Sequence, residues 1–339
     1  MNMSYLFMKL RDFINLNYLD WWYLSANPSP AAVHLLEQNL DKVLWTNLCE
    51  NPAAIHILEQ HPDKIDWSYL SSNPAAIHLL EKQIEIDADC VDWTALSSNP
   101  SAIHLLKENP DYIDWEVLSA NPGAIDLIQE ELKKTPNNIN WEWLSRNPAA
   151  IYILEENPKE INWFELSENP KAIHLLEQNP DKISWRDLSA NPKAIHILEQ
   201  NLDKIDWVYL SGNPEAIHLI SKALEQNPDK ISWRNLSVNP KAIHILEQNL
   251  DKIDWVYLSG NPEAIHLISK ALEQNPDKIN WFNLSMNPAI FTYDYEKMRE
   301  HIEQSGIKDE LISVYYNPKN IKHFLDRGDV HEGFESRWV

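Results

Sequence analysis

Tryptophan recurs in this sequence at a fixed place relative to an Asn-Pro pair, and this recurrence constrains the fold more than any other feature. Twelve of the 15 tryptophans stand six residues before Asn-Pro. They are Trp21, Trp45, Trp67, Trp93, Trp115, Trp141, Trp163, Trp185, Trp207, Trp233, Trp255 and Trp281. Successive members are 22 to 26 residues apart. A period in this range indicates a repeat architecture, in which each repeat packs mainly on its neighbours.

Each repeat predicts two helices, because it reads approximately W-x-x-L-S-x-N-P-x-A-I-H-L-L-E-Q-N-P-D-K-I. The residue before the tryptophan is Asp, Asn or Ser in every repeat except the one preceded by Leu44, and these side chains cap helix N-termini. Asn-Pro then opens the second helix, and a later Asn followed by Pro or Leu ends it. Four repeats are 26 residues long, about one helical turn more than 22, so their second helix should lengthen without turning its apolar face.

The apolar residues of the second helix fall on one face. In the helix that starts at Pro52, Ala54, Ile55 and Leu58 share an arc, and His56 lies opposite its centre. We expect the alanine to lie where neighbouring helices approach closely. We also expect the twelve tryptophans to pack in the core together with the leucine that follows each of them.

The fold class predicted from these patterns is all-α, an α-solenoid of about twelve 22- to 26-residue helix-turn-helix repeats with N- and C-terminal caps. The expected divisions are an N-terminal cap at 1–20, the solenoid at 21–286, a helical C-terminal cap at 287–328 and a flexible tail at 329–339. An open stack of twelve repeats would extend about 100 Å, at roughly 8 to 10 Å per helix layer.

Composition excludes several classes of function. The formal charge of −22 argues against binding a nucleic-acid backbone or an anionic membrane surface. Cys49 and Cys90 are too few for a disulfide framework and lack metal-ligand spacing, which favours a reducing compartment. Neither a signal peptide nor an apolar run of about 18 residues is evident, so we expect a soluble intracellular protein.

The motif N-P-x-A-I-x-L-L, with W-x-x-L-S before it and the ending IFTYDYEKM at residues 290–298, resembles the tandem-repeat proteins of giant DNA viruses of the mimivirus type. The resemblance covers about residues 10–328. It implies a viral origin, a solenoid fold and a place in the cytoplasm of an infected host cell, with the virion as an alternative. It transfers no catalytic residue. Asp126 and Tyr152 depart from the pattern, because they stand where histidine is expected.

One repeat position carries most of the histidines and is the most suggestive chemical feature. This histidine stripe comprises His34, His56, His78, His104, His174, His196, His218, His244 and His266. It is interpreted as a solvated polar stripe or as a partner-binding stripe. A zinc site is disfavoured, because ligand nitrogens must lie about 3 to 4 Å apart whereas the helix layers are about 8 to 10 Å apart. Trp22 and Trp143 lie outside the repeated tryptophan position and are further candidates for partner contact.

The sequence predicts a non-enzymatic viral repeat scaffold that mediates protein–protein interaction. No nucleotide-binding, nucleophile or metal motif occurs, so no catalytic, cofactor-binding or metal residue is assigned. We expect a monomer that binds a host or viral protein, with basic partners favoured by charge. The alternatives are a structural component of the virion or assembly compartment, and metal or small-ligand binding through the histidine stripe. Residues 185–232 and 233–280 are near-copies, so we expect a unique binding site among the divergent repeats between residues 85 and 156.

Overall fold

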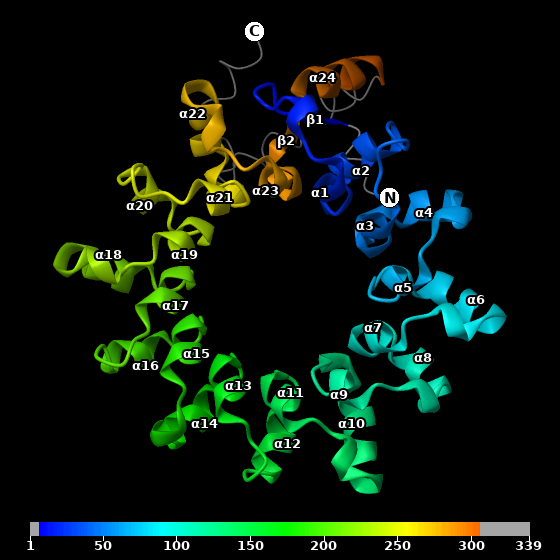
Figure 1. The fold of residues 1–339 in the computed structure, drawn as a ribbon, viewed down its shortest axis with the longest axis vertical. Coiled ribbons are helices and arrows are strands. Elements are labelled where there is room, and N and C mark those ends of the chain that lie inside the picture. Colours follow the sequence, from blue (N-terminus) through cyan, green and yellow to red (C-terminus); the bar gives the residue numbers. More distant parts are fainter. Residues whose placement is uncertain (1–6, 306–339) are drawn as a thin grey trace, which may run out of the picture. The chain divides into compact units, whose positions relative to one another are not determined.

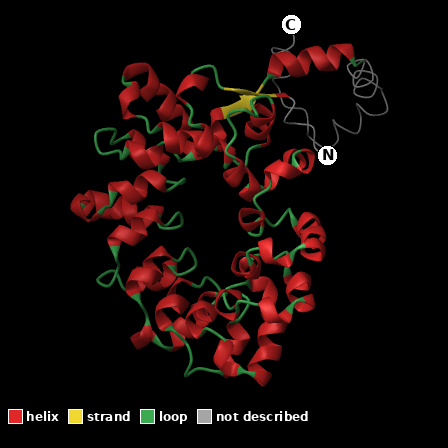
Figure 2. Ribbon diagram, turned by 45° about the vertical axis from the view of Figure 1, so that its right-hand side comes forward, coloured by secondary structure: helices red, strands yellow, loops and turns green. Residues whose placement is uncertain are grey.

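The computed structural model describes residues 7–305. The described residues form two compact bodies, a large one of residues 10–291 and a small one of residues 7–9 and 292–305. Helices make up almost all of the regular structure, with one short sheet (Figure 2), which confirms the all-α solenoid class. Repeats 1 to 12 are numbered below by their tryptophans, and positions within a repeat are counted from the tryptophan as position 0.

Each repeat begins with a short first helix that starts at its tryptophan. These helices are α1 Trp21–Ser25, α3 Trp45–Glu50, α5 Trp67–Leu70, α7 Trp93–Ser98, α9 Trp115–Leu118, α11 Trp141–Arg146, α13 Trp163–Glu168, α15 Trp185–Ala190, α17 Trp207–Gly212, α19 Trp233–Val238, α21 Trp255–Leu258 and α23 Trp281–Met286. The predicted caps form in ten repeats, where the side chain at position −1 accepts a backbone N–H of the first turn. Leu44 and Ser184 provide no such bond.

A second helix follows in repeats 1 to 11. These helices are α2 Pro30–Glu37, α4 Ile55–Gln60, α6 Ile77–Ile86, α8 Ile103–Glu108, α10 Ile125–Lys134, α12 Ile151–Glu156, α14 Ile173–Gln178, α16 Ile195–Gln200, α18 Ile217–Gln226, α20 Ile243–Glu247 and α22 Ile265–Gln274. The four longer repeats supply α6, α10, α18 and α22, so the expected extra turn of helix is confirmed. From the second repeat on, the α-helix begins at isoleucine, three residues after the proline, because Asn-Pro first forms a turn or a 3₁₀ segment such as η3 Pro52–Ala54.

The remaining segments are short. Further 3₁₀ turns are η2 Leu16–Tyr18, η4 Pro62–Lys64, η5 Ala88–Cys90, η6 Pro110–Tyr112, η7 Pro122–Ala124, η8 Pro136–Asn138, η9 Pro180–Lys182, η10 Pro228–Lys230, η11 Pro262–Ala264, η12 Pro276–Lys278 and η13 Pro288–Ile290. The strands β1 Met8–Leu10 and β2 Phe291–Tyr293 pair with each other. The small body also contains α24 Tyr295–Gln304. The rest of the predicted C-terminal cap and the predicted tail at 329–339 lie outside the described residues.

The core is built from five repeated positions rather than from tryptophan. Leucine at position +3 and the alanine of the second helix are fully buried in every repeat that has them. The leucine or isoleucine four residues after this alanine, such as Leu198, is fully buried as well. Serine at +4 and asparagine at +6 are equally buried, although they are polar. All twelve tryptophans are only half-buried, so the prediction that they pack in the core is wrong. Each tryptophan is the first residue of its helix, and that helix leaves one face of the indole ring uncovered. The segment that leads into the next repeat covers this face.

The residue three before the next tryptophan covers that face. Lysine at this position places its ammonium 4.4 to 5.3 Å from the ring centroid in six repeats, as Lys182 does over Trp163. Tyr112 stacks on Trp93 with ring centroids 4.6 Å apart. Cation–π and aromatic contacts of this kind suit a partly wet ring edge.

Two hydrogen bonds, one buried and one partly buried, join each repeat to the next. The side-chain amide of the Asn-Pro asparagine donates to the carbonyl of the preceding repeat at position +4, as Asn121 does to Ser97 at 2.9 Å. The hydroxyl at +4 accepts the backbone N–H of the residue before the next tryptophan, as Ser97 does from Asp114 at 3.0 Å. Cys49 replaces serine once, and its sulfur accepts the N–H of Asp66 at 3.4 Å. No buried side-chain N or O atom among the described residues lacks a partner.

The same two bonds join repeat 12 to repeat 1. Asn27 donates to the carbonyl of Ser285 at 2.9 Å, and the N–H of Asp20 donates to the Ser285 hydroxyl at 2.8 Å. Tyr18 lies on Trp281 with centroids 5.1 Å apart, as its equivalents do elsewhere. The large body is therefore a closed ring, with the first helices inside and the second helices outside (Figure 1). The curvature per repeat, which the sequence does not fix, brings the two end repeats together, so the repeats do not extend over the about 100 Å of an open stack.

Candidate functional site: the outer histidine stripe and the inner band

The histidine stripe lies on the outer row of helices and is bonded from repeat to repeat. In seven repeats the histidine Nε2 lies 2.6 to 2.8 Å from a glutamate oxygen of the preceding repeat. The pairs are His56–Glu37, His78–Glu59, His104–Glu81, His174–Glu155, His196–Glu177, His218–Glu199 and His266–Glu247. Each glutamate stands three residues after its own histidine position, one turn along the helix, which points it toward the next repeat.

Two histidines of the stripe differ from the rest. His34 belongs to the first repeat, and its Nδ1 lies 3.2 Å from Glu37 of the same helix. For His244 the corresponding residue of the preceding repeat is Ser221 instead of glutamate. The stripe thus consists mainly of exposed His–Glu pairs, and these pairs connect neighbouring repeats. Exposed pairs of this kind contribute about 0 to 1 kcal/mol each.

The sequence interpretation missed the glutamate partners. These partners, such as Glu59, Glu177, Glu199 and Glu247, are a whole repeat apart from one another along the sequence, so the sequence pattern does not pair any of them with a histidine. The long side chains of histidine and glutamate together cross the gap between helix layers, which neither residue crosses alone. In residues 7–305, no group of three or more His, Cys, Asp or Glu side chains could hold a metal ion.

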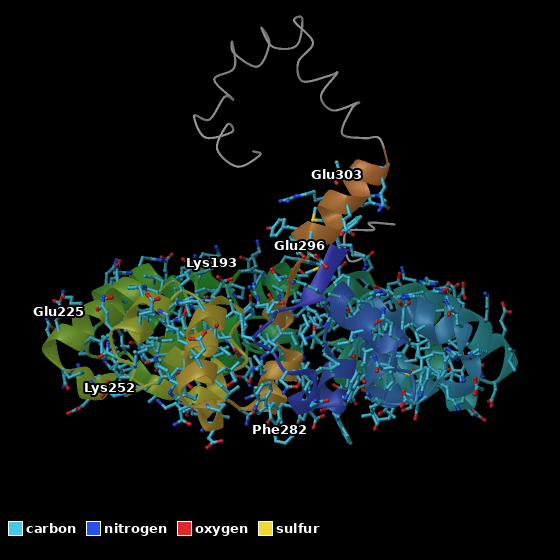
Figure 3. All side chains as sticks on the ribbon, turned by 90° about the horizontal axis from the view of Figure 1, so that it is seen from above. Lys193, Glu225, Lys252, Phe282, Glu296 and Glu303 are labelled. Carbon is cyan, nitrogen blue, oxygen red and sulfur yellow. The ribbon has the colours of Figure 1, made fainter. Side chains whose placement is uncertain are left out.

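A second surface lies on the first helices, on the side turned away from the second helices. Positions +3 and +4 are buried, so positions +1, +2 and +5 occupy the opposite side of each first helix. These three positions in all twelve repeats are called the inner band here. Figure 3 shows Phe282, at position +1, at one rim of the ring, and Lys193, which follows Asn-Pro, toward the other.

The inner band holds most of the exposed large apolar side chains of the ring. They are Trp22, Tyr69, Trp143, Phe164, Val208, Val238, Val256, Phe282 and Met286. Trp22 and Trp143, the two further candidates for partner contact, are 58% and 40% exposed. The band brings these two tryptophans onto the same surface, away from the histidine stripe.

Side chains of the band contact one another across repeat boundaries. The guanidinium of Arg234 lies 4.4 Å from the ring centroid of Tyr257, and Arg186 makes the same contact with Tyr209. Tyr23 and Phe282 make the equivalent contact where the ring closes, with centroids 5.5 Å apart. Contacts of this kind therefore join neighbouring repeats of the band at three junctions, including the closing one.

Other hollows and segments offer less chemistry. One open depression, about 470 Å³, is lined by Trp45, Asp63, Lys64 and Cys90 among others, and its Asp63 and Lys64 side chains pair with each other at 3.2 Å. None of the helices between residues 7 and 305 is long and apolar enough to cross a membrane. Comparison with family models, with curated proteins and with solved structures found no match to this chain.

Proposed function

We propose that this protein is a non-enzymatic scaffold that binds another protein through the inner band of its ring. Following the resemblance to giant-virus repeat proteins, we further propose that it acts in the cytoplasm of infected host cells. One observation carries the scaffold proposal: the positions that differ most among the twelve repeats are the exposed positions of the inner band.

The positions that stay constant are used inside the molecule. Leucine at +3, serine at +4 and asparagine at +6 pack or hydrogen bond between repeats, so a change there damages the ring itself. Position +1 in contrast carries Trp, Thr, Ser, Glu, Phe, Arg and Val in different repeats. A rigid frame with variable exposed positions is the usual arrangement of repeat proteins that bind partners.

The histidine stripe is a weaker candidate for the same role. Its histidines are mostly paired to glutamates of neighbouring repeats, so a partner would have to compete with those bonds. The sequence-based alternative is a structural component of the virion or assembly compartment. A component that spaces other parts would use two separate ends, and the bonds between repeat 12 and repeat 1 join the two ends of the ring instead.

Photo-crosslinking tests the proposal. A benzoylphenylalanine residue is placed at Phe164 or Phe282 in the inner band, and at Leu202 or Leu250, which are exposed apolar residues outside it. In cells that express the full chain, the band positions should yield one or a few adducts that mass spectrometry identifies and that the purified partner reproduces. If band and control positions give the same adducts, or neither gives any, the scaffold proposal is wrong.

A further inference from the structure

One arc of the inner band has no carboxylate, although the protein as a whole carries a charge of −22. The arc consists of repeats 9 to 12 and repeat 1, which are contiguous because the ring closes. Its fifteen residues are Val208, Tyr209, Gly212, Arg234, Asn235, Val238, Val256, Tyr257, Gly260, Phe282, Asn283, Met286, Trp22, Tyr23 and Ala26. Arg234 is the single charged side chain among them. This set is called the apolar arc.

Hydrogen bonds and ring contacts hold the apolar arc together. The side-chain amides of Asn235 and Asn283 each donate, at 2.7 Å, to the position +1 carbonyl of the preceding repeat, Val208 and Val256 respectively. The contact between Tyr23 and Phe282 continues the arc into repeat 1. Fixed side chains lose little conformational entropy when they bind, which favours a binding surface.

The rest of the inner band, in repeats 2 to 8, is acidic. Its charged residues are six carboxylates and two arginines: Glu50, Glu116, Glu142, Glu165, Glu168, Asp187, Arg146 and Arg186. Arg146 is bonded to Glu165 and Glu168, both at 2.8 Å. Within the described chain Glu50, Glu116 and Glu142 form no ion pair with a basic side chain. The band therefore has an apolar side and an acidic side.

The ring is wide enough for a helix. Twelve first helices spaced about 8 to 10 Å apart form a circle about 31 to 38 Å across, and the helix thickness leaves about 20 to 27 Å between opposite surfaces. A helix with its side chains is about 10 to 12 Å across. A helical segment thus fits inside the ring and can approach both sides of the band.

We propose that the inner band binds a basic amphipathic helix of a partner protein, with its apolar face on the apolar arc and its lysines or arginines toward Glu50, Glu116 and Glu142. This inference rests on the proposed scaffold function and names the surface and the class of partner. An apolar helix face laid on an apolar surface is a recurring mode of peptide recognition, and the opposite charges select the basic helix.

Binding of synthetic helical peptides to the full chain tests this inference. The probe is an 18-residue peptide of leucine and lysine with all leucines on one face; a leucine–glutamate peptide of the same pattern and a scrambled leucine–lysine peptide serve as comparisons. Fluorescence anisotropy should show that the patterned leucine–lysine peptide binds best, and that its binding weakens with salt.

Two pairs of variants locate the binding. Val256→Ser/Phe282→Ser should weaken binding about tenfold because it removes central apolar contacts without changing charge. Leu202→Ser/Leu250→Ser, with similarly exposed side chains outside the band, should leave it unchanged. Glu116→Gln/Glu142→Gln should weaken binding several-fold more than Glu225→Gln/Glu273→Gln, which removes the same charge from the outer helices.

Inner and outer variants that weaken binding equally would overturn the inference, as would tighter binding of the leucine–glutamate peptide. If light scattering shows that the full chain dimerises and that Val256→Ser/Phe282→Ser abolishes the dimer, the occupant is a second copy, which also overturns it. Crosslinking of Phe282 to a partner segment that is not basic would overturn this inference and leave the scaffold function intact. Absence of any crosslinked partner would count against the scaffold function itself.

Discussion

Closure of the ring makes a quantitative prediction about Asn27. This side chain is fully buried, donates to the Ser285 carbonyl at 2.9 Å, and accepts the N–H of Ser29 at 3.0 Å. Asn27→Ala leaves a buried donor and a buried acceptor without these bonds, at a cost of about 1 to 3 kcal/mol for each group. In an open stack the first repeat has no predecessor, and the same change would cost only the bond to Ser29, about 1 kcal/mol.

Asn121→Ala is the matched internal control. Asn121 donates to the Ser97 carbonyl at 2.9 Å and accepts the N–H of Gly123 at 2.9 Å, so its bonds nearly duplicate those of Asn27. In a closed ring the two side chains have equivalent bonds, so the two variants should lose the same free energy of unfolding within about 0.5 kcal/mol.

Urea unfolding followed by tryptophan fluorescence measures both losses, and the slope of free energy against urea concentration shows whether the transitions stay comparable. X-ray scattering adds a second readout, because opening the ring increases its radius of gyration. An Asn27→Ala loss more than about 1 kcal/mol below that of Asn121→Ala would refute closure, because it would mean that the Asn27 amide meets water instead of Ser285.

Three further predictions concern other parts of the ring. Burial raises the pKa of the Cys49 thiol and so disfavours its reactive thiolate, and we expect iodoacetamide at pH 8 to label the partly exposed Cys90 first. Mass spectrometry should show that the two cysteines are labelled equally fast only in denaturant. Preferential labelling of Cys49 in the native protein would contradict this. His196→Ala removes one exposed pair with Glu177 and should lower the free energy of unfolding by at most about 1 kcal/mol in urea titrations, with a smaller loss in 1 M salt. A loss above about 2 kcal/mol would contradict the interpretation of this pair as a weak surface contact. Deletion of residues 185–232 removes two whole repeats, so closure would need a turn of about 36° per repeat instead of about 30°, and we expect the hydrogen bond from Asn27 to Ser285 to break. In the deletion variant, Asn27→Ala should then lower the free energy of unfolding only as much as in an open stack. If Asn27→Ala still causes its full loss of free energy there, the junctions adapt to the smaller ring.

Much of the fold follows from local sequence signals. Ten of the eleven predicted caps and the extra helical turn of the 26-residue repeats depend on neighbouring residues, and the structure has them where the sequence predicts them. Ser184 makes no cap bond, and from the second repeat on the α-helix begins three residues after the proline that was expected to open it. The alanine position is also buried as expected. Closure depends instead on the angle between successive repeats, which accumulates from small packing differences and leaves no motif in the sequence.

The roles of polar residues were harder to predict. Serine at +4 and asparagine at +6 look like ordinary turn residues, yet both are buried and bonded between repeats, as Ser97 and Asn121 are. Tryptophan is the most conspicuous residue of the repeat. It is only half-buried because it stands at the start of a helix, where a lysine side chain covers its ring, as Lys182 covers Trp163. Part of the apolar arc could not be predicted, because repeat 1 joins repeats 9 to 12 only where the ring closes. The sequence predicted a unique binding site among the divergent repeats between residues 85 and 156 instead.

The junction between repeat 12 and repeat 1 uses the same bonds as the internal junctions, so nothing in the packing marks it as the place where the chain must begin and end. The N–H of Arg11 donates to the carbonyl of Ile290 at 2.9 Å, which holds the two ends of the ring side by side. A short linker between these ends, with a new opening in an exposed turn that follows a second helix, should give a circular permutant that keeps every Asn-Pro junction. The ring can equally be inserted as one block into a surface loop of another protein, because its entry and exit points coincide.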